Sequence, residues 1–362
     1  MFSFRSNMRF IFLLLLSGLT VAACGGGGGG GGGDDRIQPG SEWLITTSYV
    51  AAGGPGVDGI PAIENPNFET AETISSVGDT DLVIALRSGG QVKAYPHDIM
   101  DYHEIVNDGP SDNPFTMSYC PLTGSALAWK GTASHADASF GVSGLLYSSN
   151  LLLYDRETQT LWSQMLQLAV NGPRIREVPE NIQVIEADFA TLKAMYPDAL
   201  VMTRATGHDR AYDNYPYGDY REVEGFLFRV AGEDTRIPPK QRVLGIHDGD
   251  DVKVYQMETF GISTQTINDQ FKDQPIVVVG NSAQNYAAIY SRELADGTIL
   301  SMSPLQDDLP NVMTDTEGNV WDVFGTAVSG PRAGAQLEST KSYIAMWFGW
   351  AAHFRNIEIY FN

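Results

Sequence analysis

Cys120 is the side chain of this sequence best suited to nucleophilic chemistry. The run FTMSY at residues 115–119 is typical of a β-strand, and Pro121 suits the first position of a helical turn. We therefore expect Cys120 at the N-cap of that turn. A thiol there faces unpaired N–H donors and the positive end of the helix dipole, which favour the thiolate, the form that attacks electrophiles and binds metals. The alternative is a small buried hydrophobic residue, because free cysteine is among the most buried residue types.

His103 is the expected partner of this thiol. Pro96 begins a short helical pattern in which Ile99, Met100 and His103 share one face, so the imidazole is expected to point inward. An inward histidine can be a hydrogen-bonded core residue. Beside a thiol, an imidazole can instead act as a general base or as a metal ligand.

These residue types allow covalent catalysis. Cys120 is then the nucleophile and His103 the base, while Arg156 or Gln164 orients a small polar or anionic substrate. The sequence supplies the side chains that this chemistry needs, and the fold must bring them together.

Two other functions use the same part of the chain. A metal site would have Cys120, His103 and His97 as ligands, since a thiolate with imidazoles suits copper or zinc, although no close spacing such as CxxC or HExxH accompanies them. The other alternative is a non-catalytic module that binds a partner or glycan through tyrosines, which offer rigid contact area at low entropic cost. Its candidate residues are Tyr212, Tyr215, Tyr217 and Tyr220.

The elements that must position these residues occur twice in the sequence. LVIALRSGGQVKAY begins at Leu82 and VLGIHDGDDVKVY begins at Val243, and each is typical of a β-hairpin. Further matches follow in the same order. They are Asn107-Asp108 with Asn268-Asp269, Pro114 with Pro275, Asp155 with Asp315, Trp162 with Trp321, and Gly172-Pro173 with Gly330-Pro331. This order indicates an internal duplication.

The duplication predicts the domain organisation. The expected segments are an irregular lead-in at 41–77, a first copy at 78–203, a Tyr-rich connector at 204–240 and a second copy at 241–362. Strand-like runs outnumber the two expected helices, at residues 188–196 and 342–354. The expected fold is therefore a β-rich α+β fold made twice, with two similar halves related by a pseudo-twofold axis.

A reactive residue that only one copy contains marks specialisation. Counted from the matched prolines, Cys120 corresponds to Asn281, and asparagine is a preferred N-cap residue. Asp155 and Trp162 occur in both copies and are expected to be structural. The other candidates that only the first copy contains are His103 and Arg156, which correspond to Thr264 and Thr316.

The N-terminus predicts a lipoprotein. Residues 1–24 combine arginines with an apolar run too short to span a membrane, and the small residues before Cys24 are typical of a lipobox. Acylated Cys24 would attach the chain to a lipid bilayer, followed by a flexible Gly-rich tether at 25–40. No aspartate follows Cys24, so we expect an outer-membrane lipoprotein that faces the periplasm or the cell exterior. The two cysteines of the chain are then Cys24 and a single free thiol, which excludes an intramolecular disulfide.

Composition excludes other classes. The chain has 362 residues with 43% hydrophobic residues, which is enough for a sizeable core, and its formal net charge is −21. So negative a protein repels phosphate backbones, and nucleic-acid binding is not expected.

Several ordered motifs resemble a known family. They are HEIVND from His103, YCPLTGSA from Tyr119, FGVSGLLY from Phe140, YDR from Tyr154 and LWSQ from Leu161. Over about residues 80–361 the chain is similar to a bacterial and archaeal family catalogued as domain of unknown function 3179, whose name implies no activity. The resemblance also implies a second cysteine in many relatives where Thr123 stands here. A dithiol redox role is thus not expected, because closing a disulfide within the motif needs a CxxC pair.

Overall fold

A computed structural model describes residues 37, 39–131 and 139–361 of the chain. In this part of the chain, strands predominate and form six sheets, with three short helices. The expectation of a β-rich chain with few helices is confirmed. The signal peptide, Cys24 and most of the Gly-rich tether lie outside the described residues.

The first central sheet is built on the predicted hairpin at residues 82–95. Its order is β14 (Val184–Asp188), β4 (Leu82–Ser88), β5 (Gln91–Pro96), β15 (Leu200–Met202) and β3 (Phe68–Thr70). The two faces of β4 pack into different hydrophobic clusters, Val83 and Ala85 into one and Ile84 and Leu86 into the other. This alternation along a strand explains why β4 is a continuous apolar run.

Two further sheets of the first half carry the candidate residues. One has the order β13 (Asn181–Ile182), β8 (Ser125–Lys130), β7 (Phe115–Cys120), β6 (Ile105–Asp108) and β2 (Ile63–Glu64). The other has the order β1 (Val50–Ala52), β9 (Phe140–Tyr147), β10 (Asn150–Asp155), β11 (Leu161–Ser163) and β12 (Leu168–Asn171). The short turn η1 (Thr47–Tyr49) precedes β1. Three short strands of the lead-in thus extend the sheets of the first half.

Three sheets also form the second half. The first has the order β25 (Ser342–Met346), β16 (Arg242–Asp248), β17 (Asp251–Gln256) and β26 (Asn356–Ile359), and it contains the second predicted hairpin. The second has the order β18 (Gln265–Phe271), β19 (Gln274–Asn281) and β20 (Tyr286–Ser291). The third has the order β21 (Met302–Pro304), β22 (Asn311–Asp315), β23 (Val320–Asp322) and β24 (Ala327–Ser329). A 3-10 turn, η2 (Met257–Phe260), leads from β17 toward β18.

The helices follow the sequence in two cases and depart from it in one. Helix α1 (His97–His103) begins after Pro96, and α2 (Phe189–Met195) begins after Asp188, whose carboxylate accepts a hydrogen bond from the Thr191 N–H. The helix expected over 342–354 is wrong in its first part. Residues 342–346 form strand β25, and α3 (Trp347–His353) begins only at Trp347. Pairing with β16 satisfies the backbone of this buried segment, so tertiary context overrides the helical pattern.

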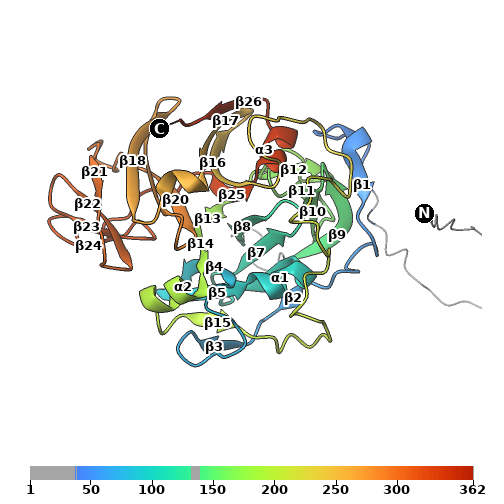
Figure 1. Ribbon diagram of the computed structural model, residues 1–362. Helices are drawn as coiled ribbons and strands as arrows, with labels where there is room; N and C mark the ends of the chain where they lie inside the picture. Colours follow the sequence, from blue (N-terminus) through green and yellow to red (C-terminus); the bar gives the residue numbers. More distant parts are fainter. Residues whose placement is uncertain (1–36, 38, 132–138, 362) are drawn as a thin grey trace, which may run out of the picture. The chain divides into compact units, whose positions relative to one another are not determined.

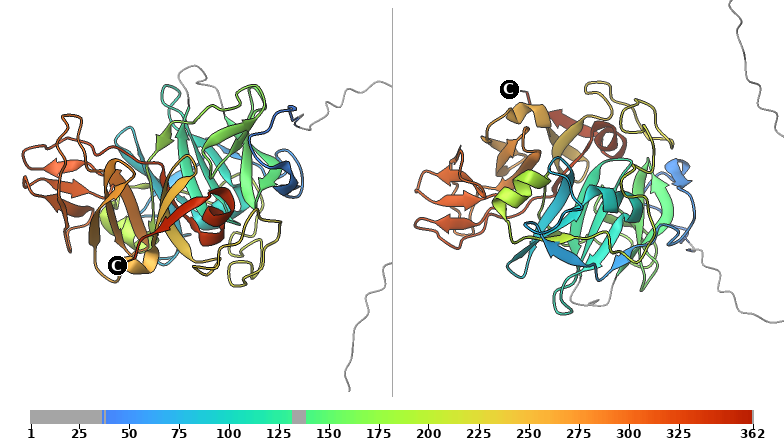
Figure 2. Two further views of the ribbon diagram at one scale, coloured as in Figure 1. Left: turned by 90° about the horizontal axis from the view of Figure 1, so that it is seen from above. Right: turned by 60° about the horizontal axis from the view of Figure 1, so that its bottom comes forward.

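Figures 1 and 2 show how these elements are arranged. The sheets β9–β12 and β21–β24 lie on opposite sides, with β4, β5, β14 and β16 between them. The connector at 204–240 contains no helix or strand among its residues, all of which are described. It runs from β15 to β16 as the yellow-green loop beside α1. Its tyrosines therefore lie over the first half of the fold.

Candidate functional site

Cys120 is the last residue of β7 and pairs with Ser125 at the start of β8. The helical turn expected after it is wrong, because Pro121, Leu122, Thr123 and Gly124 form a hairpin loop. Gly124 has φ +57°, which turns the chain back into β8 before a helix can form. Some donors that favour the thiolate are nevertheless present around the sulfur. The Thr123 hydroxyl and the backbone N–H groups of Thr123 and Leu151 each lower the pKa of the thiol, which favours the thiolate.

Burial outweighs these donors at the sulfur. Cys120 is 1% exposed and belongs to an apolar cluster, and its Sγ lies 3.7 Å from the carbonyl oxygen of Ser149. Desolvation raises the pKa of the thiol, and the nearby Glu104 raises it further. The thiol is therefore protonated at neutral pH, contrary to the expectation from a helix N-terminus.

Glu104 is a buried carboxyl residue near enough to the thiol for its charge to raise the pKa of Cys120. It follows α1 with φ +58° and is 4% exposed. Burial raises the pKa of its carboxyl group to about 8, although a hydrogen bond from Tyr217 acts in the opposite direction. A buried carboxyl that exchanges its proton near neutral pH is suited to acid–base chemistry. The sequence analysis missed this residue, and its only signal was its position beside His103.

Unusual backbone conformations surround the thiol. Besides Glu104, the two-residue turn between β9 and β10 consists of Ser148 and Ser149, with φ +48° and +66°. Residues other than glycine rarely adopt such angles, and they cluster at functional sites. The Ser149 carbonyl is the hydrogen-bond acceptor of the Cys120 thiol.

His103 is buried but does not serve the thiol. Its Nδ1 lies 2.8 Å from the Pro61 carbonyl oxygen, and its Nε2 lies 2.7 Å from the Tyr212 hydroxyl. A carbonyl only accepts, so Nδ1 carries the hydrogen and Nε2 accepts from the tyrosine. Burial lowers the pKa of His103 to about 4. Both ring nitrogens are thus engaged away from Cys120, in a bridge that fastens the connector to α1.

Gln164 does lie behind the thiol, within a set of buried polar side chains that we call the Gln164 network. Its members are Ser118, Thr123, Ser125, Asn150 and Gln164, each at most 1% exposed. The Gln164 Oε1 accepts hydrogen bonds from the Ser125 hydroxyl (2.7 Å) and from the Asn150 amide (2.8 Å). Through Thr123 the network reaches Cys120.

Arg156 lies elsewhere. It follows the end of β10 opposite to Asn150, and five residues of strand span about 16 Å. Its guanidinium donates to both carboxylate oxygens of Asp58, at 2.6 and 3.0 Å, and to the Tyr154 hydroxyl. The structure therefore does not bring Arg156 to the thiol, and this side chain fastens the lead-in to β10.

The three metal-ligand candidates are separated as well. His97 Nε2 lies 3.1 Å from Glu186 Oε2, a carboxylate oxygen that Arg242 also contacts at 2.9 Å. His103 is occupied as described above. In the part of the chain that the structure describes, no group of three or more His, Cys, Asp or Glu side chains is placed to hold a metal ion. Likewise, no helix among these residues has the length and apolarity to cross a membrane.

The connector covers the loop that follows Cys120. The Tyr215 hydroxyl donates to the Pro121 carbonyl and the Tyr220 hydroxyl to the Leu122 carbonyl, both at 3.1 Å. The Arg221 guanidinium stacks on the Tyr215 ring at 3.9 Å and donates to Asp101. These tyrosines are thus bound to the loop that follows Cys120, and Tyr212 and Tyr220 are buried.

A small cavity opens beside Glu104. Its volume is about 20 Å³, and apolar side chains, glycines, Glu104 and Tyr217 line it. Leu122 and Leu151, which flank Cys120 in space, belong to this lining. The covering segments are residues 53–60 of the lead-in and the connector around Phe228. A ligand larger than a water molecule needs these segments to move.

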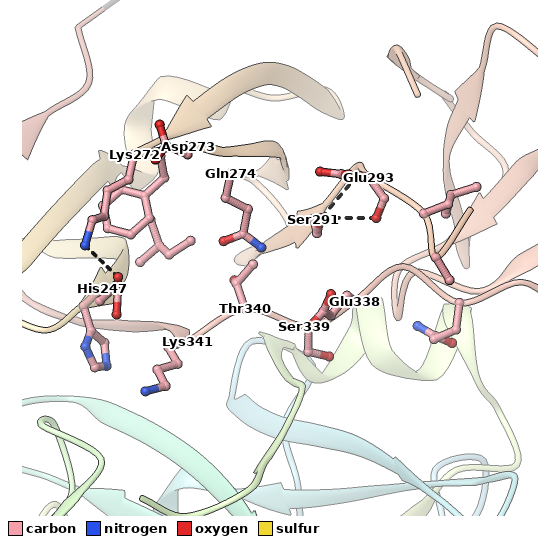
Figure 3. A pocket seen from close by; sticks show the side chains of 16 residues that line it. His247, Lys272, Asp273, Gln274, Ser291, Glu293, Glu338, Ser339, Thr340 and Lys341 are labelled. Carbon is pink, nitrogen blue, oxygen red and sulfur yellow. Dashed lines mark hydrogen bonds and ion pairs between the residues drawn. The ribbon is translucent and has the colours of Figure 1, made fainter. Parts of the chain in front are cut away.

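A larger recess lies in the second half, away from the thiol. Its volume is about 840 Å³, and polar residues from β16, β19, β20 and the segment 338–341 line it. Figure 3 shows Gln274, Ser291 and Thr340 across the opening, with the His247 ring pointing away from them. Lys272 is paired there with Asp248 at 2.7 Å.

Comparison with known proteins identifies a family. Residues 57–356 match the family described as "Protein of unknown function (DUF3179)". No curated protein and no solved structure matches the chain.

Proposed function

Because the chain belongs to the family described as protein of unknown function DUF3179, which carries no assigned activity, we propose its function from the site: a thiol enzyme that forms a covalent intermediate on Cys120. The observation that supports it is the burial of both Cys120 and Glu104, with Glu104 near enough for its charge to raise the pKa of the thiol. Glu104, rather than His103, takes the role of proton acceptor. A nucleophile next to a group that exchanges protons near neutral pH is the general pattern of covalent catalysis.

Acyl transfer is the reaction that this pair can perform. In the minor fraction of molecules in which Glu104 is ionised at neutral pH, the Cys120 sulfur forms a bond to the carbonyl carbon of an ester or thioester while its proton passes to the Glu104 carboxylate. The leaving group departs with that proton, and the acyl group remains on sulfur. Water then attacks the thioester, releasing the carboxylic acid and restoring the thiol. Backbone N–H groups at Thr123 and Leu151 surround the sulfur and are the available donors to developing negative charge.

The cavity supports a small, uncharged substrate. Its lining includes Leu122, Val142, Leu146 and Leu151, and no lysine or arginine is among its lining residues. An anionic substrate would meet Glu104 without a compensating cation, so the expectation of an anionic substrate oriented by Arg156 is replaced. A short aliphatic acyl group fits the chemistry of such a wall.

An internal duplication remains part of the proposal, and matched contacts support it. The orders β14-β4-β5-β15 and β25-β16-β17-β26 have the same parallel and antiparallel pairings. Trp162 Nε1 donates to Asp155 at 3.0 Å, as Trp321 Nε1 donates to Asp315 at 2.8 Å.

Matched asparagines give the same support. The Asn107 side chain binds both backbone groups of Phe140, and Asn268 binds those of Met302 in the same way. The Asn281 Oδ1 accepts a hydrogen bond from the Gln284 N–H in the loop that follows it. This loop has the same place in the second half as the loop after Cys120 has in the first. On this proposal the first half carries the chemistry and the second half supports it.

We also propose an envelope location through acylated Cys24, on the sequence pattern alone. Radiolabelled palmitate tests it in the expressed full chain. Label is expected in the wild type and absent after Cys24→Ser, and an unlabelled wild-type chain would contradict the anchor.

Trapping of an acyl-enzyme tests the thiol proposal. The purified protein, in a Cys24→Ser background, is incubated with p-nitrophenyl butyrate, and the tryptic peptide 94–130 is weighed by mass spectrometry. We expect a butyryl group on Cys120, none in Cys120→Ser and slower acylation in Glu104→Gln. Asn281→Ser is the matched control at the corresponding loop and should acylate normally. The proposal would be refuted if the folded wild-type protein left this peptide unmodified after incubation with the ester and with a butyryl thioester.

A further inference from the structure

The Gln164 network is a costly feature for a protein interior. Its five side chains are buried beside the apolar cluster that contains Cys120. Burying polar groups brings stability only when each finds a partner, and a partly satisfied network destabilises the fold. Such a group of residues needs a reason beyond packing.

The second half of the chain shows that this hairpin does not require polar residues. Ser118 lies two residues before Cys120 in β7, and Val279 has the same place before Asn281 in β19. Ser125 pairs with Cys120 as Tyr286 pairs with Asn281. Gln164 follows Trp162 by two residues, and Val323 follows Trp321 likewise. The corresponding interior is thus largely apolar, and Tyr286 and Val323 are buried in its hydrophobic cluster.

The hydrogen atoms of the network can be assigned almost completely. The Ser125 hydroxyl donates to Gln164 Oε1, and the Gln164 amide donates to the Ser118 hydroxyl (3.1 Å) and the Ser125 carbonyl (3.2 Å). The Ser118 hydroxyl donates to the Leu127 carbonyl. The Asn150 amide donates to the Thr123 hydroxyl oxygen at 2.9 Å and to Gln164.

The hydrogen of the Thr123 hydroxyl has two possible acceptors. The Thr123 hydroxyl lies 2.8 Å from the Ser125 oxygen, whose own hydrogen is used. Ser125 is the cross-strand partner of Cys120, and the Thr123 side chain lowers the pKa of the Cys120 thiol. While Cys120 is a thiol, its S–H points to the Ser149 carbonyl and Thr123 can donate to Ser125. When the sulfur loses its proton, the same hydroxyl can turn its hydrogen to the thiolate.

We propose that the Thr123 hydroxyl donates a hydrogen bond to the Cys120 thiolate, and that the other members of the Gln164 network are positioning residues that hold Thr123 in place. This inference rests on the proposed function only in assuming that Cys120 reacts as a thiolate. It gives Gln164 a role through Thr123 instead of a contact with substrate.

The pH profile of Cys120 alkylation tests this role. Iodoacetamide labelling of the peptide 94–130 is followed from pH 6 to 10.5 in the Cys24→Ser protein. Thr123→Val keeps the shape of the side chain but removes the donor, so the profile should move to higher pH, with labelling about tenfold slower at a fixed pH below the transition. Thr123→Ser keeps the donor and should show the wild-type pH profile.

Matched variants separate this effect from a loss of packing. Thr340→Val removes another buried threonine hydroxyl, which donates to the Ile289 carbonyl in the second half, and should leave the profile unchanged. If Thr123→Val does not fold by circular dichroism, Thr123→Ala replaces it. An unshifted profile in a folded Thr123 variant, or an equal shift in Thr340→Val, would overturn the inference. Acylation by the ester is measured separately, so an inert enzyme with a shifted profile refutes only the proposed function.

Discussion

Replacing Glu104 with glutamine should change how the stability of the protein depends on pH. In the folded chain the pKa of this carboxyl is raised from 4.5 to about 8, chiefly by burial. Between those two values the folded state keeps a proton that the unfolded state releases. Stability contributed by the protonated carboxyl is therefore complete below pH 4.5 and is lost as the pH rises through 8.

The size of the effect follows from the shift. Each pH unit in this window costs about 1.4 kcal/mol, so the full change approaches about 5 kcal/mol between pH 4.5 and pH 8. Glu104→Gln has no such titration, and its amide oxygen can still accept the hydrogen bond of Tyr217. The free energy of unfolding of the variant, relative to the wild type, should rise steadily across this window.

Urea unfolding at half-unit intervals from pH 5 to 9 measures this difference. Asp101, whose pKa burial raises to about 7, titrates in both proteins, and its charge adds to the rise in the pKa of Glu104. Glu186→Gln is the matched control, because Arg242 and His97 lower the pKa of this equally buried glutamate. Glu186→Gln should therefore lower the free energy of unfolding most at neutral pH, where the wild-type carboxylate is charged. Parallel stability curves for Glu104→Gln and the wild type would refute the assignment of a buried, protonated carboxyl beside the thiol.

Three further outcomes follow from the contacts. Asp155→Asn and Asp315→Asn each weaken a buried bond to a tryptophan, so both should lower the free energy of urea unfolding, by about 1–3 kcal/mol; a loss in only one would contradict their equivalent roles. Because the pKa of His103 is lowered to about 4, stability should fall by at most about 3 kcal/mol as the pH drops from 6.5 to 4. His103→Gln should flatten that slope in acid titrations followed by circular dichroism, and an unchanged slope would exclude the assignment. Arg156→Gln removes the ion pair of Asp58 and leaves its hydrogen bond from Tyr154, so the segment is held less firmly and iodoacetamide should label Cys120 several-fold faster at constant pH; an equal rate would show that residues 53–60 do not control access.

The parts of the fold that could be predicted are those with a local physical signal. Both hairpins combine β-rich runs with a Gly-containing turn. The start of α2 is indicated by the N-cap residue Asp188, and its end by Pro197. Strand β25 had no such signal. Its Tyr343 and Met346 fit a helix face equally well, and only the partner strand β16 decides between the two structures.

Of the candidate residues, the structure brings Gln164 toward Cys120 and places His103 and Arg156 elsewhere. Gln164 lies near the loop at Thr123, since β7, β8 and the end of β11 meet there. The charge of Glu104 acts on the thiol, whereas His103, one residue earlier, bonds to the lead-in and the connector. Adjacent residues at the end of a short helix point in different directions, and no sequence pattern tells which of them faces a particular partner.

The proposed function requires a buried thiol to react, and the connector is part of what covers that thiol. The connector is attached to the first half by polar contacts, among them Tyr212 to His103 and Tyr215 to Pro121, by the Arg221–Asp101 ion pair, and by the buried rings of Tyr212 and Tyr220. It contains no helix or strand, so its opening breaks no pairing between strands. Closed, it removes water from Cys120 and Glu104 and raises the pKa of both groups. Opening would restore solvent and lower both values, so Glu104 is a stronger base toward the thiol proton while the site is shut around its substrate.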